Sequence, residues 1–243
     1  MNELLDEVLT AHGGAQRWRS VSTITARGSV SGLLPKRFPG NKLAHFTVEV
    51  HAAEQHTVLQ DFPHAGKRAV FDRGAVRVET GDGVQLATRT DPRSAFFGRS
   101  GIRRNIHWDP LDLTYFAGYA FWNYLTAPLL LTREGITIAE GQPLQESGQQ
   151  WRRLQATFPE QIHTHCRRQT FYVDTAGLIR RHDFVAEPVG TWASATLYCD
   201  QHHEFDGLIF PTRRRVLPRG PGGRVLPRPT LLALDFHEIE IQQ

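Results

Sequence analysis

WASATLYCDQHHEFDGLIFPTRRRVLPR, residues 192–219, contains two long strand-like runs separated by Asp206-Gly207. Asp-Gly between alternating runs is a strong signal for a tight hairpin, because both central positions of a type I′ turn need positive φ. A second hairpin is predicted just upstream, in residues 167–187. Together with a final alternating run over residues 231–241, this pattern predicts a large antiparallel sheet.

The N-terminal half also alternates with a period of two, after one short helix. That helix is predicted over residues 3–12, where Gly13-Gly14 ends it. The clearest alternation, in residues 43–51, places Ala, Phe and Val on one face and His, Thr and Glu on the other. This is typical of a sheet with one dry face and one wet face. Further strands are predicted near residues 21–30, 55–62, 68–72, 75–80, 84–90, 136–139 and 151–158.

One helix rich in aromatic residues interrupts the strand pattern. Asp109 is a good N-cap and Pro110 suits the first helical position, so the helix is predicted to run from there to about Thr126. Four of its rings could provide apolar area and polar handles for a flat or greasy ligand. These rings belong to Tyr115, Phe116, Tyr119 and Trp122. The sequence leaves open the alternative that they only fill the core.

Length, charge and hydropathy set broad limits. The chain has 243 residues, 40% of them hydrophobic, and no composition break, so residues 1–243 are expected to form one domain. The formal charge of +3 comes with no broad basic face, which argues against nucleic acid as a partner. The uncharged stretch 113–132 approaches the length of a membrane span. Asn123, Gly118 and Pro128 within it favour a buried or cleft-lining helix, so no membrane span is predicted.

The location of the protein is predicted from its N-terminus and its cysteines. The first residues are acidic and helical, without the basic and then apolar segments of a secretory signal. Cys166 and Cys199 lie within predicted strands and lack the CxxC spacing of a metal or redox site. A reduced, cytoplasmic protein is therefore expected. The oligomeric state is not indicated.

Three segments together resemble the LolA/LolB-like superfamily, which has the lipoprotein-carrier fold. They are EVLTAHGGAQRWRSVSTITARGSV (7–30), FYVDTAGLIRRHDF (171–184) and YCDQHHEFDGLIFPTRRRV (198–216). The resemblance implies a cytoplasmic bacterial member with a curved, half-open antiparallel sheet. It also implies that helices close the apolar concave face, where members of the family bind acyl chains. The chain differs from the lipoprotein carriers in its lack of a visible leader and in its more aromatic central helix.

The C-terminal hairpin supplies the first candidate for acid–base chemistry. A two-residue turn would pair Phe205 with Leu208 and His203 with Phe210, so that His203, Phe205 and Phe210 share the apolar face. A histidine on a dry concave face could act as a general acid or base near neutral pH. The two phenyl rings would then contact the ligand. The alternative is a histidine that is satisfied by hydrogen bonds or lies at the solvent edge.

Two further side chains could face the same cavity. His182 would lie opposite Gln169 and share a face with Phe171, which makes it a second acid–base candidate. Arg214 could point into the cavity and bind a carboxylate, because a guanidinium group holds a carboxylate through two hydrogen bonds.

Metal and cofactor sites are not predicted. His163 and His165 would share one face of a strand, but two ligands need at least one more from elsewhere. The chain has no Gly-rich phosphate loop and no G-x-S-x-G nucleophile motif.

These features favour a binding protein for a hydrophobic or aromatic small molecule, held in the concave cavity. The alternative is a cofactor-independent enzyme, such as an isomerase, cyclase or lyase, in which His203 or His182 moves a proton. A third class is a protein-interaction module. It would use the Pro- and Arg-rich segment 215–229, which is predicted to be an exposed edge hairpin or flap because proline cannot lie in a central ladder.

Overall fold

Thirteen strands form one antiparallel sheet in the part of the chain that the computed structural model describes, residues 2–35, 43–98, 107–146 and 148–243. The N-terminal half contributes β1 (Thr23–Ser31), β2 (His45–His51), β3 (His56–Gln60), β4 (Lys67–Asp72), β5 (Ala75–Thr80) and β6 (Gln85–Arg89). The C-terminal half contributes β7 (Thr137–Glu146), β8 (Gln149–Thr157), β9 (Arg168–Val173), β10 (Ile179–Val185), β11 (Ser194–Phe205), β12 (Leu208–Pro218) and β13 (Leu232–Gln242).

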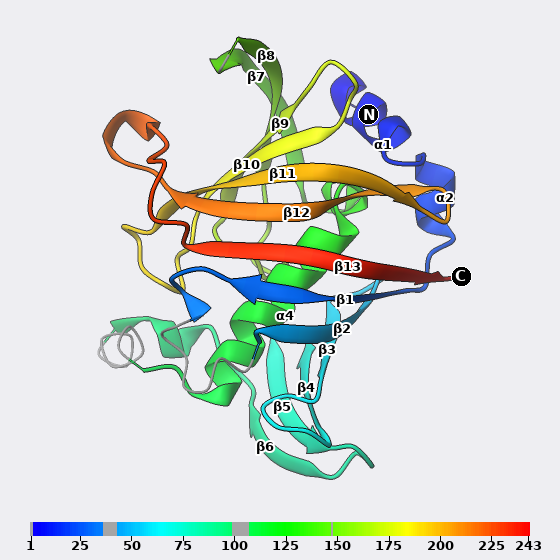
Figure 1. The fold of residues 1–243 in the computed structure, drawn as a ribbon, viewed down its shortest axis with the longest axis vertical. Helices are drawn as coiled ribbons and strands as arrows, with labels where there is room; N and C mark the ends of the chain where they lie inside the picture. Colours follow the sequence, from blue (N-terminus) through cyan, green and yellow to red (C-terminus); the bar gives the residue numbers. More distant parts are fainter. Residues whose placement is uncertain (1, 36–42, 99–106, 147) are drawn as a thin grey trace.

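The strand order is simple. It runs β6-β5-β4-β3-β2-β1-β13-β12-β11-β10-β9-β8-β7, so each half of the chain forms a meander of neighbouring strands. The antiparallel pair β1–β13 joins the two meanders. Strands β6 and β7 are the two edges, and the sheet curves around the central helix without closing into a barrel (Figure 1). The predicted fold class, a large curved antiparallel sheet with few helices, is confirmed.

Two short helices at the N-terminus cover one end of the sheet. Helix α1 (Glu3–Ala11) begins where the side chain of Asn2 accepts a hydrogen bond from the Leu5 amide, at 3.0 Å. Helix α2 (Ala15–Arg19) follows after the glycine pair and buries Trp18. The indole nitrogen of Trp18 donates to the carbonyl of His12, so the two helices are held to each other. Short 3₁₀ turns occur at η3 (Ser94–Phe96), η4 (Leu129–Thr132) and η5 (Pro221–Gly223).

Helix α4 (Pro110–Thr126) is the aromatic helix predicted from the sequence. Asp109 and Asp112 form a reciprocal capping box, in which each side chain accepts the other residue's backbone amide, at 2.9 and 3.0 Å. Arg89 on β6 pairs with both carboxylates, which ties the helix start to the edge of the sheet. The helix ends before Pro128, which has no amide hydrogen to continue it. No helix in the described ranges is long and apolar enough to cross a membrane.

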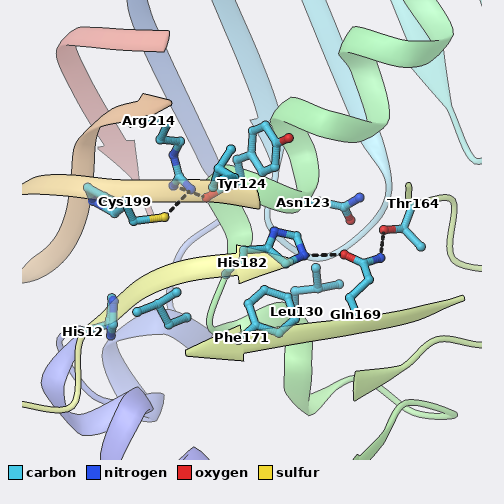
Figure 2. Close-up of a pocket in the computed structure, with 14 residues that line it drawn as sticks. His12, Asn123, Tyr124, Leu130, Thr164, Gln169, Phe171, His182, Cys199 and Arg214 are labelled. Carbon is cyan, nitrogen blue, oxygen red and sulfur yellow. Dashed lines mark hydrogen bonds between the residues drawn. The ribbon is translucent and has the colours of Figure 1, made fainter. Parts of the chain in front are cut away.

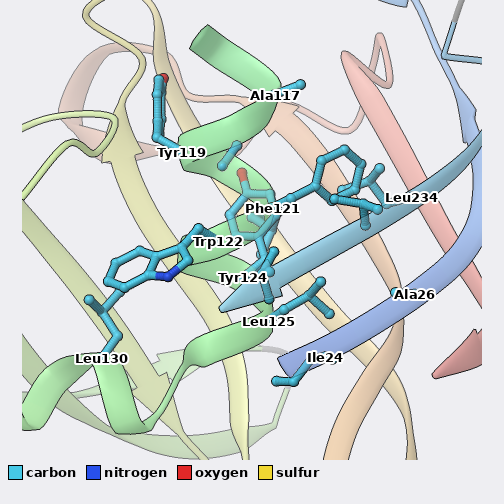
Figure 3. Packing of buried hydrophobic residues seen from close by; sticks show 14 of the residues in the cluster. Ile24, Ala26, Ala117, Tyr119, Phe121, Trp122, Tyr124, Leu125, Leu130 and Leu234 are labelled. Carbon is cyan, nitrogen blue, oxygen red and sulfur yellow. The ribbon is translucent and has the colours of Figure 1, made fainter. Parts of the chain in front are cut away.

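Helix α4 is apolar around its whole circumference, as expected of a helix that is buried on all sides. Figure 3 shows Trp122 extending from the helix toward Leu130. The Phe121 ring packs instead against Phe46 on β2, with ring centroids 4.7 Å apart, and faces Phe236 on β13. The helix is therefore buried on both of these sides.

Close packing of α4 on β4 gives the first testable prediction. A Cβ atom at Gly118 would collide with the Phe71 side chain, whose Cγ would be 2.9 Å away, and Phe71 is fully buried. Alanine would gain up to about 1 kcal/mol of helix propensity. Overpacking against a rigid ring costs about 1–3 kcal/mol, and a Cβ atom cannot rotate away. Gly118→Ala is therefore expected to lower the free energy of unfolding by about 1–2 kcal/mol in urea denaturation.

Gly81→Ala is the matched control for this substitution. A Cβ atom there meets only the Gly66 carbonyl oxygen, at 3.4 Å, which is an ordinary contact. Its effect is expected to stay within about 0.5 kcal/mol. Equal stability of both variants would contradict the close approach of α4 to β4.

The structure confirms the register of the C-terminal hairpin but corrects the position of the segment that follows it. Phe205 pairs with Leu208 and His203 with Phe210, as predicted. Segment 215–229 is not at an edge of the sheet, because it contains the end of β12 and most of the loop that leads to β13, and both are central strands. Its prolines lie at the end of β12 and beyond it, where no ladder needs their missing amide hydrogens. The loop projects from the end of the sheet opposite to α2 (Figure 1).

Candidate functional site

A cavity of about 510 Å³ lies between α4 and the sheet, and we call it the outer chamber. Its sheet side is formed by β10–β13 with residues such as Phe184, Ala195, Val216 and Leu234. Loops at one end of the sheet complete it with Leu33, Leu34, Val189 and Trp192. Trp192 and Leu33 are 72% and 50% exposed, so the chamber reaches the surface between these loops. Its size and apolar wall are those of a site for a hydrophobic small molecule.

One side of α4 provides the helical wall of the outer chamber. Its members recur at three- and four-residue steps, which place side chains on one face of a helix. They are Leu113, Phe116, Ala117, Ala120, Phe121 and Tyr124. The small side chains of Ala117 and Ala120 leave the space that the neighbouring rings would otherwise fill.

The wall of the outer chamber contains a buried polar group, the imidazole of His165. Its Nδ1 lies 3.1 Å from the Tyr119 hydroxyl and its Nε2 lies 2.7 Å from the Tyr124 hydroxyl. The ring stacks on Phe184 with centroids 4.0 Å apart. Burial lowers the pKa of His165 well below its usual value, so the ring is neutral. A neutral ring held by two hydroxyl groups suits an apolar wall better than a charged ring would.

A second, much smaller cavity of about 20 Å³ lies next to the outer chamber, with His12 beside α1 in its wall, and we call it the inner chamber. Tyr124 belongs to the walls of both chambers, and we call the two together the groove. Its volume holds one or two water molecules. Its wall includes His12, Asn123, Tyr124, Gln169, His182, Cys199 and Arg214, so it is more polar than the outer chamber (Figure 2).

His182 is the central histidine of the inner chamber. Its Nε2 lies 2.5 Å from Oε1 of Gln169, whose amide nitrogen donates to Thr164 and to the carbonyl of Cys166. These donations fix the orientation of the amide, so Nε2 of His182 carries the proton. The ring stacks on Phe171 with centroids 4.2 Å apart. Burial, and to a smaller extent the charge of Arg214, lower the pKa of His182 to about 3.

Arg214 enters the inner chamber from β12 and is only 5% exposed. One of its terminal nitrogens donates to the Tyr124 carbonyl at 2.8 Å, and the other lies 3.7 Å from the sulfur of Cys199. Its Nε is buried and has no hydrogen-bond partner among the described residues. Burial lowers the pKa of Arg214, yet a guanidinium group remains charged in proteins. The inner chamber therefore has a positive field.

The predicted ligand-binding residues divide between the chambers and the core. Phe116 lines the outer chamber and Arg214 lines the inner chamber, so these two lie on the groove. Tyr115, Tyr119 and Trp122 are completely buried on the other side of α4. Their polar atoms bind protein groups: His163 and Arg93 for Tyr115, His165 for Tyr119, and the His51 carbonyl for Trp122. These three side chains therefore fill the core, which is the alternative that the sequence left open.

The predicted residues of the C-terminal hairpin lie away from both chambers. Phe210 is buried against Trp18 of α2, with ring centroids 5.4 Å apart, and Phe205 packs beside it. His203 pairs with Phe210 as predicted, but its side chain is exposed, so the solvent-edge alternative describes it. Gln201, two residues earlier, has a positive φ of 53°. The neighbouring His202 is half-buried, and its Nε2 bonds the Ile179 carbonyl.

His182 lies on the buried face of the sheet, as predicted, but it pairs with a different residue of β9 than the predicted Gln169. It pairs with Phe171 across β9 and β10, because the strands change register between Ile179 and Arg181. Gln169 is still within reach and forms the hydrogen bond described above. His163 and His165 bond separate tyrosine hydroxyls. Among the described residues, no group of three or more His, Cys, Asp or Glu side chains is placed to hold a metal ion.

Most residues of the outer chamber were missed by the sequence reasoning. The three- and four-residue spacing from Leu113 to Tyr124 was available, but the helix is apolar all round and the Tyr115-Tyr119-Trp122 face has larger rings. Leu33 could have been noticed as a large apolar residue between two predicted strands, whereas Trp192 was assigned to the start of a strand. His165 was noticed only as a possible metal ligand.

The arrangement defines a LolA-like fold: a curved antiparallel sheet, open along one side, with a helix on its concave face and an apolar chamber between the two. The solved structure of a LolA superfamily protein from Nitrosomonas europaea has a TM-score of 0.54 and 10% identity, over 98% of this chain and 92% of that one. A domain from Vibrio parahaemolyticus, named for outer membrane lipoprotein sorting, has a TM-score of 0.55 and 10% identity, over 99% and 91%.

A DUF1329 family protein from Desulfovibrio piger is similar at a TM-score of 0.52 and 14% identity, over 98% of this chain and 91% of that one. No protein-family model and no curated protein matches the sequence. At these identities the comparisons establish the fold, and the fold resemblance stated from the sequence is confirmed.

Proposed function

We propose that the protein binds a hydrophobic small molecule or acyl chain in the outer chamber. The observation that carries this proposal is the cavity of about 510 Å³ with an almost entirely apolar wall. Burying a ligand there removes apolar surface from water, at about 25 cal/mol per Å². A name among the structural relatives that refers to lipoprotein sorting agrees with an acyl-chain ligand. The proposed ligand class includes aliphatic and aromatic molecules. The proposed location of the protein is the cytoplasm.

The geometry favours binding over the enzyme alternative. That alternative needs a histidine that can exchange a proton with a ligand in the cavity. His203 is exposed and lines neither chamber. His182 lies in the inner chamber with its proton directed at Gln169, and His165 has both ring nitrogens bonded by tyrosines. None of these three histidines offers a free proton-transfer position to the outer chamber.

The proposal is tested by identifying what the purified protein carries. We expect native mass spectrometry of protein expressed in bacteria to show a bound species, and denaturing extraction to release a lipid or another apolar metabolite in about a one-to-one ratio. Protein that is stripped of this ligand should bind the neutral dye Nile red with a single site. Stripped, folded protein that binds neither the extracted species nor Nile red would contradict the proposal.

A further inference from the structure

The two chambers lie next to each other along the same three strands. On β12, Val216 lines the outer chamber and Arg214, two residues away on the same face, lines the inner one. On β11 the change occurs between Ala195 and Leu197, and on β10 between Phe184 and His182. A step of two residues along a strand is about 6.7 Å.

Strands β10 and β11 thus change from one chamber to the other at the same residue pair, and β12 changes one pair further along, because Val216 of the outer chamber lies opposite Leu197 of the inner one. Tyr124 of α4 lines both chambers and lies at this boundary. The groove is therefore wide and apolar on one side of Tyr124, and narrow and polar on the other.

The narrow end contains a buried cation without a buried anion. Arg214 forms no ion pair with any carboxylate in the described part of the chain. Burial raises the pKa of the Cys199 thiol and of the Tyr124 hydroxyl, so neither neighbour supplies a negative charge. The Tyr124 carbonyl belongs to the last turn of α4, and the partial negative charge of a helix C-terminus compensates a fraction of one unit charge.

A buried charge is costly unless it is paired and fully hydrogen-bonded. In Arg214 the Nε proton is free, and one terminal nitrogen has only a weak acceptor, the sulfur of Cys199. The aromatic rings of Tyr124 and Phe236 lie with their centroids 5.2 and 5.8 Å from the guanidinium carbon. These rings hold the guanidinium group in place but carry no charge that would neutralise it. The fork geometry of a guanidinium group matches a carboxylate.

We propose that the ligand is an apolar carboxylic acid that lies with its tail in the outer chamber and its carboxylate on Arg214 in the inner chamber. This inference rests on the proposed function and specifies the ligand class. The side chain of Tyr124 turns aside to let the head group pass, and the carboxylate displaces the water that the inner chamber can hold. The acid thereby supplies the negative charge that the fold does not supply.

The test compares two probes with the same tail, laurate and dodecanol, at about pH 8, where the acid is fully ionised. Affinities are measured by displacement of Nile red. An apolar pocket alone would prefer the alcohol, because the carboxylate loses more hydration on entry. We expect the wild-type protein to bind laurate at least ~10-fold more tightly than dodecanol, a difference of about 1.4 kcal/mol.

Arg214→Met removes the charge and keeps the length of the side chain. We expect this variant to lose the preference for laurate and to bind dodecanol as the wild-type protein does. Arg213→Met is the matched control, because Arg213 is the neighbouring arginine, with a side chain that is 49% exposed. It should retain the preference.

The outcomes separate the two proposals. Equal affinity of the wild-type protein for laurate and dodecanol would overturn the carboxylate site and leave hydrophobic binding intact. Binding of neither probe, nor of Nile red, would overturn hydrophobic binding itself. The wild-type comparison decides the question even where Arg214→Met does not fold. Equal loss of both probes in a folded Arg214→Met variant would assign Arg214 a structural role only.

Discussion

Ala120→Trp is expected to weaken the binding of an apolar ligand by at least ~30-fold while the protein stays folded. Ala120 is 7% exposed and faces the outer chamber from the middle of α4. An indole ring at this position would occupy space that the ligand needs. A ligand that loses about 80 Å² of buried apolar surface loses about 2 kcal/mol, which is about 30-fold in affinity.

The stability of this variant is the second half of the prediction. A larger side chain usually strains a packed core, at a cost of about 1–3 kcal/mol. Here the ring enters an existing cavity of about 510 Å³, so we expect the melting temperature to stay the same or to rise. Nile red titration and thermal unfolding of the same sample measure both effects.

Ala139→Trp is the matched control, since Ala139 is an exposed residue of the edge strand β7. We expect it to bind Nile red as the wild-type protein does. Wild-type affinity in a folded Ala120→Trp variant would place the ligand outside the outer chamber. A lower melting temperature together with lost binding would show that the chamber is not the open space described here.

Local signals in the sequence were sufficient for the elements of the fold. Asp206-Gly207 determines the turn of the last hairpin, and Asp109-Pro110 determines where α4 begins, because each signal acts within a few residues. The pairing of β1 with β13 joins residues from opposite ends of the chain, and no local signal specifies it. The resemblance implied a curved, half-open sheet, but this pairing was not predicted.

The site was less predictable than the fold, for two physical reasons. Periodicity shows which face of an element is apolar, but it does not show where packing leaves a void. In α4 every face is apolar, so the side with Ala117 and Ala120 could not be chosen over the side with Tyr119 and Trp122. The second reason is backbone conformation. Gln201 adopts a positive φ within β11, and His203 is exposed although it pairs with the buried Phe210, which alternation alone does not predict.

For Arg214, in contrast, the sequence predicted the position of the side chain correctly. Its neighbours Arg213 and Arg215 alternate with it along β12, and strict alternation correctly placed it on the inner face. What the sequence could not show is that no carboxylate of the described residues approaches it. An unpaired buried charge depends on every element that packs around it, so it becomes visible only in three dimensions.

Acidification is expected to destabilise the protein by at least about 4 kcal/mol between pH 7 and pH 5, before most carboxylates are protonated. Burial lowers the pKa of His12 to about 4 and that of His182 to about 3. In the unfolded chain both histidines titrate at about 6.5. Between these values the unfolded state binds more protons than the folded state, so stability is present above pH 6.5 and is lost as the pH falls.

Each of these histidines lowers the free energy of unfolding by about 1.4 kcal/mol for every pH unit below about 6.5. For the two groups together the loss is about 4 kcal/mol at pH 5. Burial also lowers the pKa of His202 and of His165, so both act in the same direction. Urea denaturation at a series of pH values measures the effect as the slope of the unfolding free energy against pH. Near pH 5.5 the expected slope corresponds to more than about two additional protons bound by the unfolded state.

Two substitutions at one stacked pair test the cause of this slope. His182→Phe removes a titrating group and should lower the slope by about one proton, or about 1.4 kcal/mol per pH unit. Phe171→Leu disturbs the same ring contact but keeps the histidine, so it should lower stability at every pH and leave the slope unchanged. A flat stability profile from pH 7 to pH 5 would mean that the folded protein accepts these protons. The groove around Arg214 would then have to be open to water, and it could not maintain the positive field on which the carboxylate site depends.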